Sequence, residues 1–124
     1  MTKTIMIVDD SATMLMSLRS TLEMNGYKVE AASDGQAAAD RLGSGVRPDL
    51  IITDVNMPRM GGLELIRHVR SLPGHRFTPI VTLTTESQSD MRDEGRRLGA
   101  TGWLVKPVAG PALIGVIKQV LPGS

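Results

Sequence analysis

Three carboxylates, a hydroxyl and an ammonium stand in this sequence directly after short apolar runs. In chain order these positions are Asp9 and Asp10, then Asp54, then Thr84 with Thr85 and Glu86 behind it, and last Lys106. If the apolar runs are strands of one parallel sheet, their carboxyl ends meet at a common edge, which is where such sheets bind ligands. The spacing therefore predicts a single site that combines all of these groups.

Oxygen ligands without histidine or cysteine favour a hard cation, with magnesium as the first choice. Carboxylates that lie close together repel one another by several kcal/mol where water is partly excluded, so a bound cation would explain the cluster. A carboxylate can also attack phosphorus and become an aspartyl phosphate. Asp54 is the expected nucleophile, and Asp9 and Asp10 are the expected metal pair. Lys106 would neutralise charge on the transferred group.

Each of these residues alone has an ordinary structural explanation. An aspartate behind a strand often caps a helix, a threonine is common within strands, and a lone lysine is usually a solvated charge. The functional interpretation therefore depends on the coincidence of all of them at one predicted edge.

The apolar pattern predicts five strands that alternate with five helices. The strands are expected at Ile5–Val8, Lys28–Ala31, Leu50–Thr53, Ile80–Leu83 and Trp103–Val105. The helices are expected from Ser11 to Asn25, over Gln36–Leu42, around Leu63, Ile66 and Val69, over Ser87–Leu98, and from Pro111 to Leu121. This alternation is typical of an α/β fold with a doubly wound parallel sheet and helices on both faces.

Composition limits the remaining classes of protein. The 124 residues suit one domain, expected to span residues 1–124 with no output domain behind the last helix. Lys plus Arg number 14 and Asp plus Glu 13, a net charge of +1 that gives no support for a nucleic-acid or membrane partner. The absence of cysteine and of a signal-peptide pattern leads us to expect a cytoplasmic protein.

Smaller expectations concern packing. The eight methionines are expected to fill the core, because the side chain is flexible and apolar. His68 and His75 are expected at the surface, since neither has a ligand-like neighbour. Asp93 is placed to pair with Arg96 and Arg97 on one helix.

Taken together, these residues resemble the receiver domain of two-component response regulators. The resemblance rests on Asp9-Asp10, on Asp54 followed by Met57-Pro58 and Gly62, on Thr84, and on Lys106-Pro107, all in order behind their predicted strands. It extends over nearly the whole chain, and within the family it is strongest to stand-alone chemotaxis regulators. It implies a five-stranded, flavodoxin-like sheet with the strand order 2-1-3-4-5.

The resemblance also implies how the site would work. Asp54 would be the phosphoacceptor, and the phosphodonor would be a histidine kinase. Asp10 and Asp54 would bind magnesium directly, Asp9 through water, and Asn56 through its backbone carbonyl. Lys106 would pair with the phosphoryl group. The protein would then be a switch rather than an enzyme, apart from its own phosphorylation and dephosphorylation.

A second set of implied roles concerns switching. Thr84 would move to hydrogen-bond the phosphoryl group, and Trp103 would occupy the aromatic switch position. Asn56 and Glu86 would tune the phosphoryl lifetime, and the Lys106–Pro107 bond would be cis. The target would be a partner protein, such as a flagellar motor switch component, docked on the fourth helix, fifth strand and last helix. A phosphatase is a further expected partner.

Three glycine or valine positions depart from the family pattern. Many relatives carry an acidic or amide residue where Gly61 stands, and chemotaxis regulators often carry an aromatic residue at Val108. Gly115 lies inside the last predicted helix, where glycine costs about 1 kcal/mol relative to alanine. Val108 argues against a motor-directed surface, and Gly115 leaves room for close packing with a partner.

Three rival functions remain to be compared. An aspartate-nucleophile phosphatase needs an acid two residues behind Asp54, where Asn56 stands and cannot donate a proton as an acid does. A flavin mononucleotide module would need phosphate-binding donors where Asp9 and Asp10 would repel the phosphate, and a yellow preparation would support it. A phosphorelay intermediate or phosphate sink would use the same chemistry, and the sequence does not decide between this role and a messenger.

Overall fold

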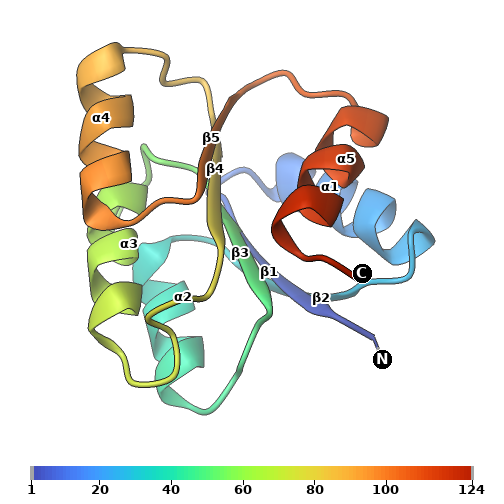
Figure 1. Cartoon of the computed structure of the whole chain (residues 1–124), viewed down its shortest axis with the longest axis horizontal. Helices are drawn as coiled ribbons and strands as arrows, with labels where there is room; N and C mark the ends of the chain where they lie inside the picture. The colour runs from blue at the N-terminus through green and yellow to red at the C-terminus, as the bar shows by residue number, and fades with distance from the viewer. Residues whose placement is uncertain (1, 124) are drawn as a thin grey trace.

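Strands and helices alternate throughout the computed structural model, which describes residues 2–123 (Figure 1). The strands are β1 (Thr4–Val8), β2 (Lys28–Ala32), β3 (Leu50–Thr53), β4 (Ile80–Thr84) and β5 (Gly102–Val105). The helices are α1 (Ala12–Met24), α2 (Gly35–Gly43), α3 (Gly62–Ser71), α4 (Ser89–Leu98) and α5 (Gly110–Val120). None of these helices is long and apolar enough to span a membrane.

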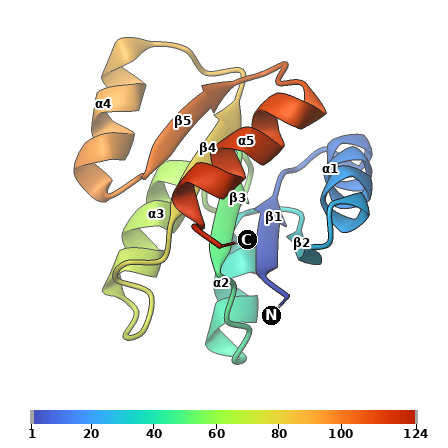
Figure 2. The same ribbon diagram turned by 45° about the vertical axis from the view of Figure 1, so that its right-hand side comes forward.

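The strands form one parallel sheet in the order β2-β1-β3-β4-β5. β1 lies between β2 and β3, so that Ile7 is opposite both Ala31 and Ile52. Helices α2, α3 and α4 cover one face of the sheet, and α1 and α5 cover the other (Figures 1 and 2). The doubly wound, flavodoxin-like fold and its strand order are therefore confirmed.

Side-chain alternation along the strands divides the core into two layers. In β1, Ile5 and Ile7 pack in the cluster with α1 and α5, whereas Met6 and Val8 pack in the cluster with α2 and α3. Each of the four is at most 1% exposed, and burial of such a side chain contributes roughly 1.5–3 kcal/mol. Burial on both faces explains why the strands appear in the sequence as nearly continuous apolar runs.

Helix caps fix where the chain turns away from the sheet. The Ser11 hydroxyl accepts the Met14 N–H at 3.2 Å, so the predicted N-cap of α1 is confirmed. The Asp34 carboxylate accepts the Ala37 N–H at 2.8 Å and begins α2 in the same way. Such caps typically contribute about 1 kcal/mol. They bring the chain from β1 and β2 into α1 and α2 over short connections at the same edge of the sheet.

The structure contradicts the prediction that His75 lies at the surface. His75 is 6% exposed, its Nδ1 lies 3.0 Å from the Thr78 hydroxyl, and its carbonyl oxygen accepts a hydrogen bond from Arg70. Burial lowers the pKa of His75, and the charges of Arg47 and Arg70 lower it further. The burial comes from the fold of the α3–β4 connection, which no periodic pattern reveals. His68 is half-buried.

Two further expectations were wrong in detail. Arg97 pairs with Glu94 at 2.6 Å rather than with Asp93, because the longer glutamate side chain reaches it one turn away. The methionines do not all fill the core: Met6 is buried, but Met16 and Met24 are 72% and 84% exposed on α1.

Candidate functional site

Three carboxylates meet at the carboxyl edge of the two central strands. Asp9 and Asp10 follow β1 and Asp54 follows β3, and the pairing of Val8 with Thr53 brings these strand ends level. Each carboxylate offers an oxygen within 4.8 Å of the others. Asp9 and Asp54 are buried, whereas Asp10 is exposed, so the cluster is open to solvent on one side.

Backbone N–H groups hold the two buried carboxylates in place. Asp9 Oδ1 accepts the Ser11 N–H at 2.9 Å, and Asp54 Oδ1 accepts the Val55 N–H at 2.7 Å. These are charge-assisted hydrogen bonds, which are stronger than neutral ones. One oxygen of each carboxylate is thereby used by the chain itself, while the Oδ2 atoms face Lys106.

Lys106 supplies the positive charge of the site from beyond β5. Its Nζ lies 2.8 Å from Asp9 Oδ2 and 3.3 Å from Asp54 Oδ2. Burial lowers the pKa of the ammonium, but the hydrogen bond to Asp9 and the charges of Asp54 and Asp9 outweigh it and raise the pKa above its usual value. The lysine is therefore charged at any physiological pH. The Lys106–Pro107 bond is cis, as the family resemblance implies.

The balance of charge at this edge suits a divalent cation. Three carboxylates and one ammonium leave a surplus of two negative charges in a cluster whose members, apart from the exposed Asp10, are largely removed from water. The donor set consists only of oxygen, and the accessible side of the cluster is formed by Asp10. Hard cations such as magnesium are bound by a few carboxylates of this kind together with water. The residues present therefore fit a magnesium ion.

Thr84 and Trp103 are linked through the chain behind β4. Thr84 is fully buried at the end of β4, and its hydroxyl accepts the Glu86 N–H at 3.1 Å. The half-buried Trp103 in β5 donates its indole N–H to the Glu86 carbonyl at 2.9 Å. The ring lies over α4 at Gly95, where a Cβ atom would approach Cζ3 to 2.8 Å. A change at Thr84 thus has a short path to Trp103.

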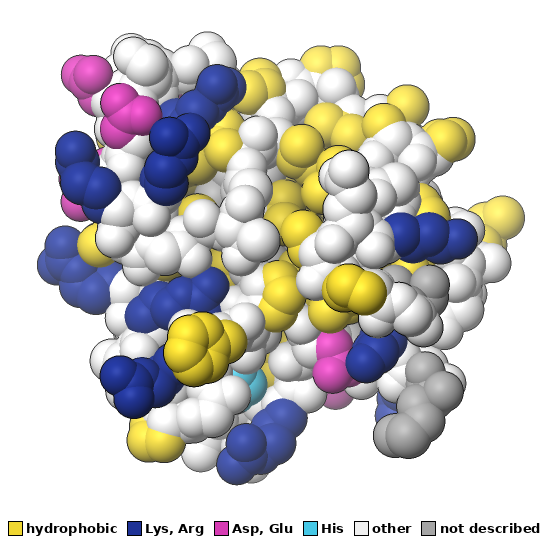
Figure 3. All heavy atoms as spheres, viewed as in Figure 1, with side chains coloured by type: hydrophobic (Ala, Val, Ile, Leu, Met, Phe, Trp, Pro, Cys, Tyr) yellow, Lys and Arg dark blue, Asp and Glu magenta, His cyan; other side chains and the backbone are white. Residues whose placement is uncertain are grey.

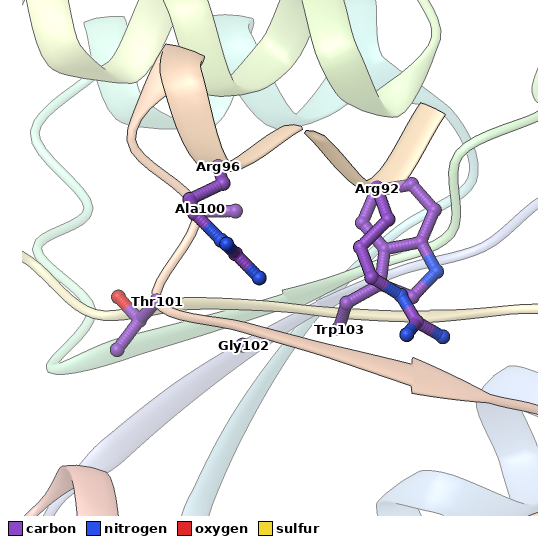
Figure 4. A pocket seen from close by; sticks show the side chains of 6 residues that line it. All are labelled: Arg92, Arg96, Ala100, Thr101, Gly102 and Trp103. Carbon is purple, nitrogen blue, oxygen red and sulfur yellow. The ribbon is translucent and has the colours of Figure 1, made fainter. Parts of the chain in front are cut away.

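Trp103 also lines a hollow between α4 and β5. The hollow has a volume of about 240 Å³ and is lined by Arg92, Arg96, Ala100, Thr101, Gly102 and Trp103. Figure 4 shows the arginine side chains coming from α4 and the tryptophan from β5. The predicted output surface therefore contains a basic hollow whose wall includes the predicted switch residue.

The remaining predicted residues lie around this edge. Asn56 is exposed in the β3–α3 connection, two residues behind Asp54, and Glu86 is half-buried in the β4–α4 connection. Val108 packs against the core cluster on the α1 and α5 face. Gly115 is exposed, and a Cβ atom there would meet nothing within 4 Å.

A clasp between the β3–α3 connection and α2 was not predicted from the sequence. Arg59 binds the Asp34 carboxylate with Nε at 2.9 Å and Nη2 at 3.3 Å. The Arg59 and Met60 carbonyls accept N–H groups from Gln36 and Gly35, both at 3.0 Å. Arg59 and Met60 have positive φ angles of 49° and 82°, which are costly for residues other than glycine. These bonds hold the chain that carries Asp54 in a fixed shape.

Glycines allow the same connection to fold tightly against the site. A Cβ atom at Gly62 would lie 2.2 Å from the Asp54 carbonyl oxygen, and one at Gly61 would lie 2.8 Å from the Val55 carbonyl oxygen. Gly61 therefore permits a close approach of the chain to Val55, which gives a structural reason for the departure at this position. The glycine pair was a sequence signal for this close packing.

Comparison with known proteins matches this geometry to one family. The model of the response regulator receiver domain matches residues 5–118. The response regulator MprA of Mycolicibacterium vanbaalenii is 40% identical over 117 residues, which cover 94% of this chain and 49% of that protein. This chain thus spans about half the length of the curated relatives that it matches.

Solved structures show the same fold at similar identity. The chemotaxis response regulator CheY4 of Vibrio cholerae superposes with a TM-score of 0.91 at 41% identity, over 98% of this chain and all of that one. The signal receiver domain of a signal transduction histidine kinase from Syntrophus aciditrophicus superposes with a TM-score of 0.87 at 36% identity, over 98% and 91% of the chains. The chain belongs to the response regulator receiver domain family and is the receiver domain of a two-component response regulator.

Proposed function

We propose that this receiver domain takes a phosphoryl group from a histidine kinase onto Asp54 and thereby changes its affinity for a partner protein. The observation that carries the proposal is the contact of Lys106 with both Asp9 and Asp54 at the open end of the sheet. A carboxylate nucleophile, a cation for the transferred group and two further acids lie together there.

The chain's own groups supply the nucleophile, hold it in place and bind the transferred group. A carboxylate oxygen of Asp54 attacks phosphorus and forms an acyl phosphate, while the bond from phosphorus to the donor histidine nitrogen breaks and its electron pair stays with the nitrogen. Lys106 already stands 3.3 Å from Asp54 Oδ2, where it can bind phosphoryl oxygens. The N–H of Val55 holds Asp54 Oδ1 and fixes the orientation of the carboxylate.

Magnesium is the proposed cofactor, held by Asp9, Asp10, Asp54 and the backbone carbonyl of Asn56. When bound, the ion would neutralise charge on the phosphoryl oxygens as it does in other phosphoryl transfers. Asp10 would be a direct ligand of the ion, so its substitution by alanine should weaken magnesium binding strongly.

Asn56 and Glu86 are proposed to tune how long the phosphoryl group survives. Both stand two residues beyond a central residue of the site, Asn56 behind Asp54 and Glu86 behind Thr84. A bulky or cationic side chain at either position should change the rate at which water removes the phosphoryl group, while uptake persists. Identical decay in wild type and variants would contradict this role.

For output, we propose that Thr84 turns its hydroxyl to the phosphoryl group and that Trp103 moves with it. The fact that supports this coupling is that both side chains bond to Glu86, Thr84 to its N–H and Trp103 to its carbonyl. The surface of α4, β5 and α5 would then change toward the target. Because the proposed phosphodonor is a histidine kinase, we expect the protein to act in the cytoplasm.

A role in chemotaxis, with a target such as a flagellar motor switch component, is supported by the likeness to CheY4. The alternative is a phosphorelay intermediate or phosphate sink with the same chemistry. The likeness to a receiver domain of a histidine kinase supports the alternative. A pull-down with phosphorylated and unphosphorylated protein separates the two, because only a messenger gains a target on phosphorylation.

The direct test of the proposed chemistry is uptake of phosphate from acetyl phosphate, followed by intact mass. The wild type should gain one phosphoryl group with magnesium and none with EDTA, and Asp54→Asn should gain none. Uptake by Asp54→Asn at the rate of the wild type would overturn the assignment.

A further inference from the structure

A second hollow lies at the opposite end of the sheet from the proposed phosphorylation site. It has a volume of about 540 Å³ and is formed by residues 47–49, which lead into β3, and residues 74–78, which lead into β4. Strands β3 and β4 begin here, whereas Asp54 and Thr84 stand at their far ends. The hollow is therefore separate from the proposed site and its output surface.

An exposed aromatic ring stands at this hollow. Phe77 is 93% exposed, more than Met16 or Met24, the two other large hydrophobic side chains that stand out from the described surface. A phenylalanine in this position contributes almost nothing to the core, although burial of its ring would remove about 150–250 Å² from water. Aromatic side chains and arginines are enriched in protein interfaces.

Basic side chains with no ion pair surround the ring. Arg47 and Arg76 line the hollow and are exposed, and within residues 2–123 neither has an ion pair or a hydrogen-bonded partner. The Arg47 guanidinium extends to Gly74, where a Cβ atom would lie 3.1 Å from Nη1. Figure 3 shows an exposed hydrophobic side chain among Lys and Arg side chains on the lower part of this face.

The floor of the hollow is firmly held and lies in a positive field. Arg70 donates to the His75 carbonyl at 2.9 Å and to the Gly99 carbonyl at 2.8 Å. The pKa of His75 lies below its usual value because of burial, and next because of the charges of Arg47 and Arg70. A carboxylate brought to Arg47 would therefore be attracted by several cations at once.

The lining of this hollow also contains one carboxylate, Asp49, which favours a peptide over a nucleic acid as the ligand. Asp49 accepts the Thr4 N–H at 2.8 Å and remains part of the wall. A nucleic-acid backbone carries a charge at every step and would be repelled there, and two free arginines neutralise few phosphates. A peptide can instead place separate carboxylates on Arg47 and Arg76 and an apolar side chain on Phe77.

We propose that this hollow, with Arg47, Arg76 and Phe77, is a docking site for an acidic protein segment that also carries apolar side chains. Docking there is independent of phosphorylation, because the site shares no residue with the edge that holds Asp54. The domain thus offers a constant contact at one end of its sheet and a switched contact at the other.

The test is an amide NMR titration of the full chain with a synthetic peptide of alternating glutamate and leucine. Shift changes should gather at residues 47–49 and 74–78. The double charge reversal Arg47→Glu/Arg76→Glu should weaken binding at least about tenfold, and Phe77→Ala should weaken it without a change of charge. The double variant Arg92→Glu/Arg96→Glu has the same net charge and should bind at this hollow as the wild type does.

Magnesium with beryllofluoride should leave the peptide affinity unchanged to within about twofold. The Arg47→Glu/Arg76→Glu variant should still take up phosphate from acetyl phosphate, so a failure at this hollow is distinguishable from a failure of the proposed switch. Shift changes only at other surfaces, or none at all, would overturn the proposal. Binding of an oligouridine at this hollow in preference to the peptide would also overturn it and indicate a nucleic-acid site.

Discussion

The connection from β3 to α3 is fastened to distant parts of the chain, whereas the connection from β4 to α4 is held mainly by its own neighbours. The first bonds to α2 through Arg59 and Met60 and packs on Asp54 through Gly62. In the second connection, the Glu86 N–H bonds the Thr84 hydroxyl and the Gln88 N–H bonds the Glu86 carboxylate, so each bond joins residues that are two positions apart. A long-range hydrogen bond to this connection comes from the Trp103 indole N–H, which donates to the Glu86 carbonyl.

The difference extends into the helices that follow. Helix α3 buries Leu65, Ile66 and Val69, whereas the residue that α4 buries is Gly95. Few buried apolar contacts and exposed backbone bonds are the features of a segment that opens at low free energy. One edge of the sheet thus combines a rigid side at Asp54, the proposed phosphoacceptor, with a yielding side for the proposed response, and four substitutions test this division.

Gly62→Ala should have the largest effect on stability, because it disturbs the packing of the rigid side. A Cβ atom 2.2 Å from the Asp54 carbonyl oxygen forces the backbone to move, so the free energy of unfolding should fall by about 3 kcal/mol. Urea unfolding measures this. Gly115→Ala is the matched control: it lies in open space on α5 and should stabilise by about 0.5–1 kcal/mol. Equal stability of the two variants would refute the tight packing behind Asp54.

Lys106→Met removes the group that joins the two sides. Its N–H bonds the Thr84 carbonyl, and its Nζ bonds Asp9 and Asp54. Without the ammonium, two buried carboxylates lose their partner, which should cost about 2 kcal/mol in magnesium-free buffer because the site is partly open to water. Magnesium should restore part of this loss, while phosphorylation from acetyl phosphate stays slow. Unfolding curves and phosphorylation rates that match those of the wild type would contradict both roles.

Thr84→Ala tests the yielding side. Loss of the hydroxyl leaves the Glu86 N–H without its acceptor, so stability should fall by about 1 kcal/mol. Asp54 should still take up phosphate, but the change in Trp103 fluorescence with magnesium and beryllofluoride should be lost. Thr84→Ser keeps the hydroxyl and should keep the change. A full fluorescence response in the alanine variant would disconnect Thr84 from Trp103.

Arg59→Gln should have the smallest effect on stability, because the guanidinium is mostly exposed. The hydrogen bond from Arg59, and next that from the Ala37 N–H, lower the pKa of Asp34 below 3.8. As the pH falls, Asp34 therefore takes up its proton in the unfolded chain before it does so in the folded one. The pair stabilises the fold above about pH 4, and this contribution is lost as the pH falls through the folded pKa of Asp34. The difference between wild type and Arg59→Gln should be present at neutral pH and vanish below the folded pKa of Asp34.

Arg59→Lys keeps the charge but not the bidentate hydrogen bonding to Asp34, so its stability should lie between those of the wild type and Arg59→Gln. If the stabilities of wild type and Arg59→Gln remained parallel down to the lowest pH, the clasp would not contribute to the rigid side. Slower phosphorylation of Arg59→Gln with unchanged folding would show that the clasp positions the loop of Asp54.

The sequence predicted the strands well because burial on both faces leaves an apolar run that needs no knowledge of the partner strand. β3 was predicted to the residue, and parallel strands necessarily bring Asp9, Asp54 and Lys106 to one edge. Helix ends were less accurate: α4 begins at Ser89 rather than Ser87, since Gln88 is still extended. Local caps such as Ser11 were predictable because their partners lie three residues away.

What the sequence could not show depends on residues far apart in the chain. Arg59 and Asp34 are separated by 25 positions, and nothing in their local patterns links them. His75 is buried by a loop, and Phe77 in the same loop is exposed, although hydrophobicity predicts the reverse. In both cases the direction of the side chain follows from the path of an irregular connection, and such a connection has no repeating hydrophobic pattern from which burial could be predicted.

Hydrogen exchange on the full chain, with and without magnesium and beryllofluoride, tests the central claim most directly. Activation at Asp54 should produce its largest change in amide protection over residues 84–90 and around Trp103. Residues 54–62 should show only a gain in protection. Neither change should appear in Asp54→Asn. Equal changes in Asp54→Asn, or changes confined to residues 54–62, would contradict a switch in which a rigid phosphoacceptor loop drives a yielding response loop.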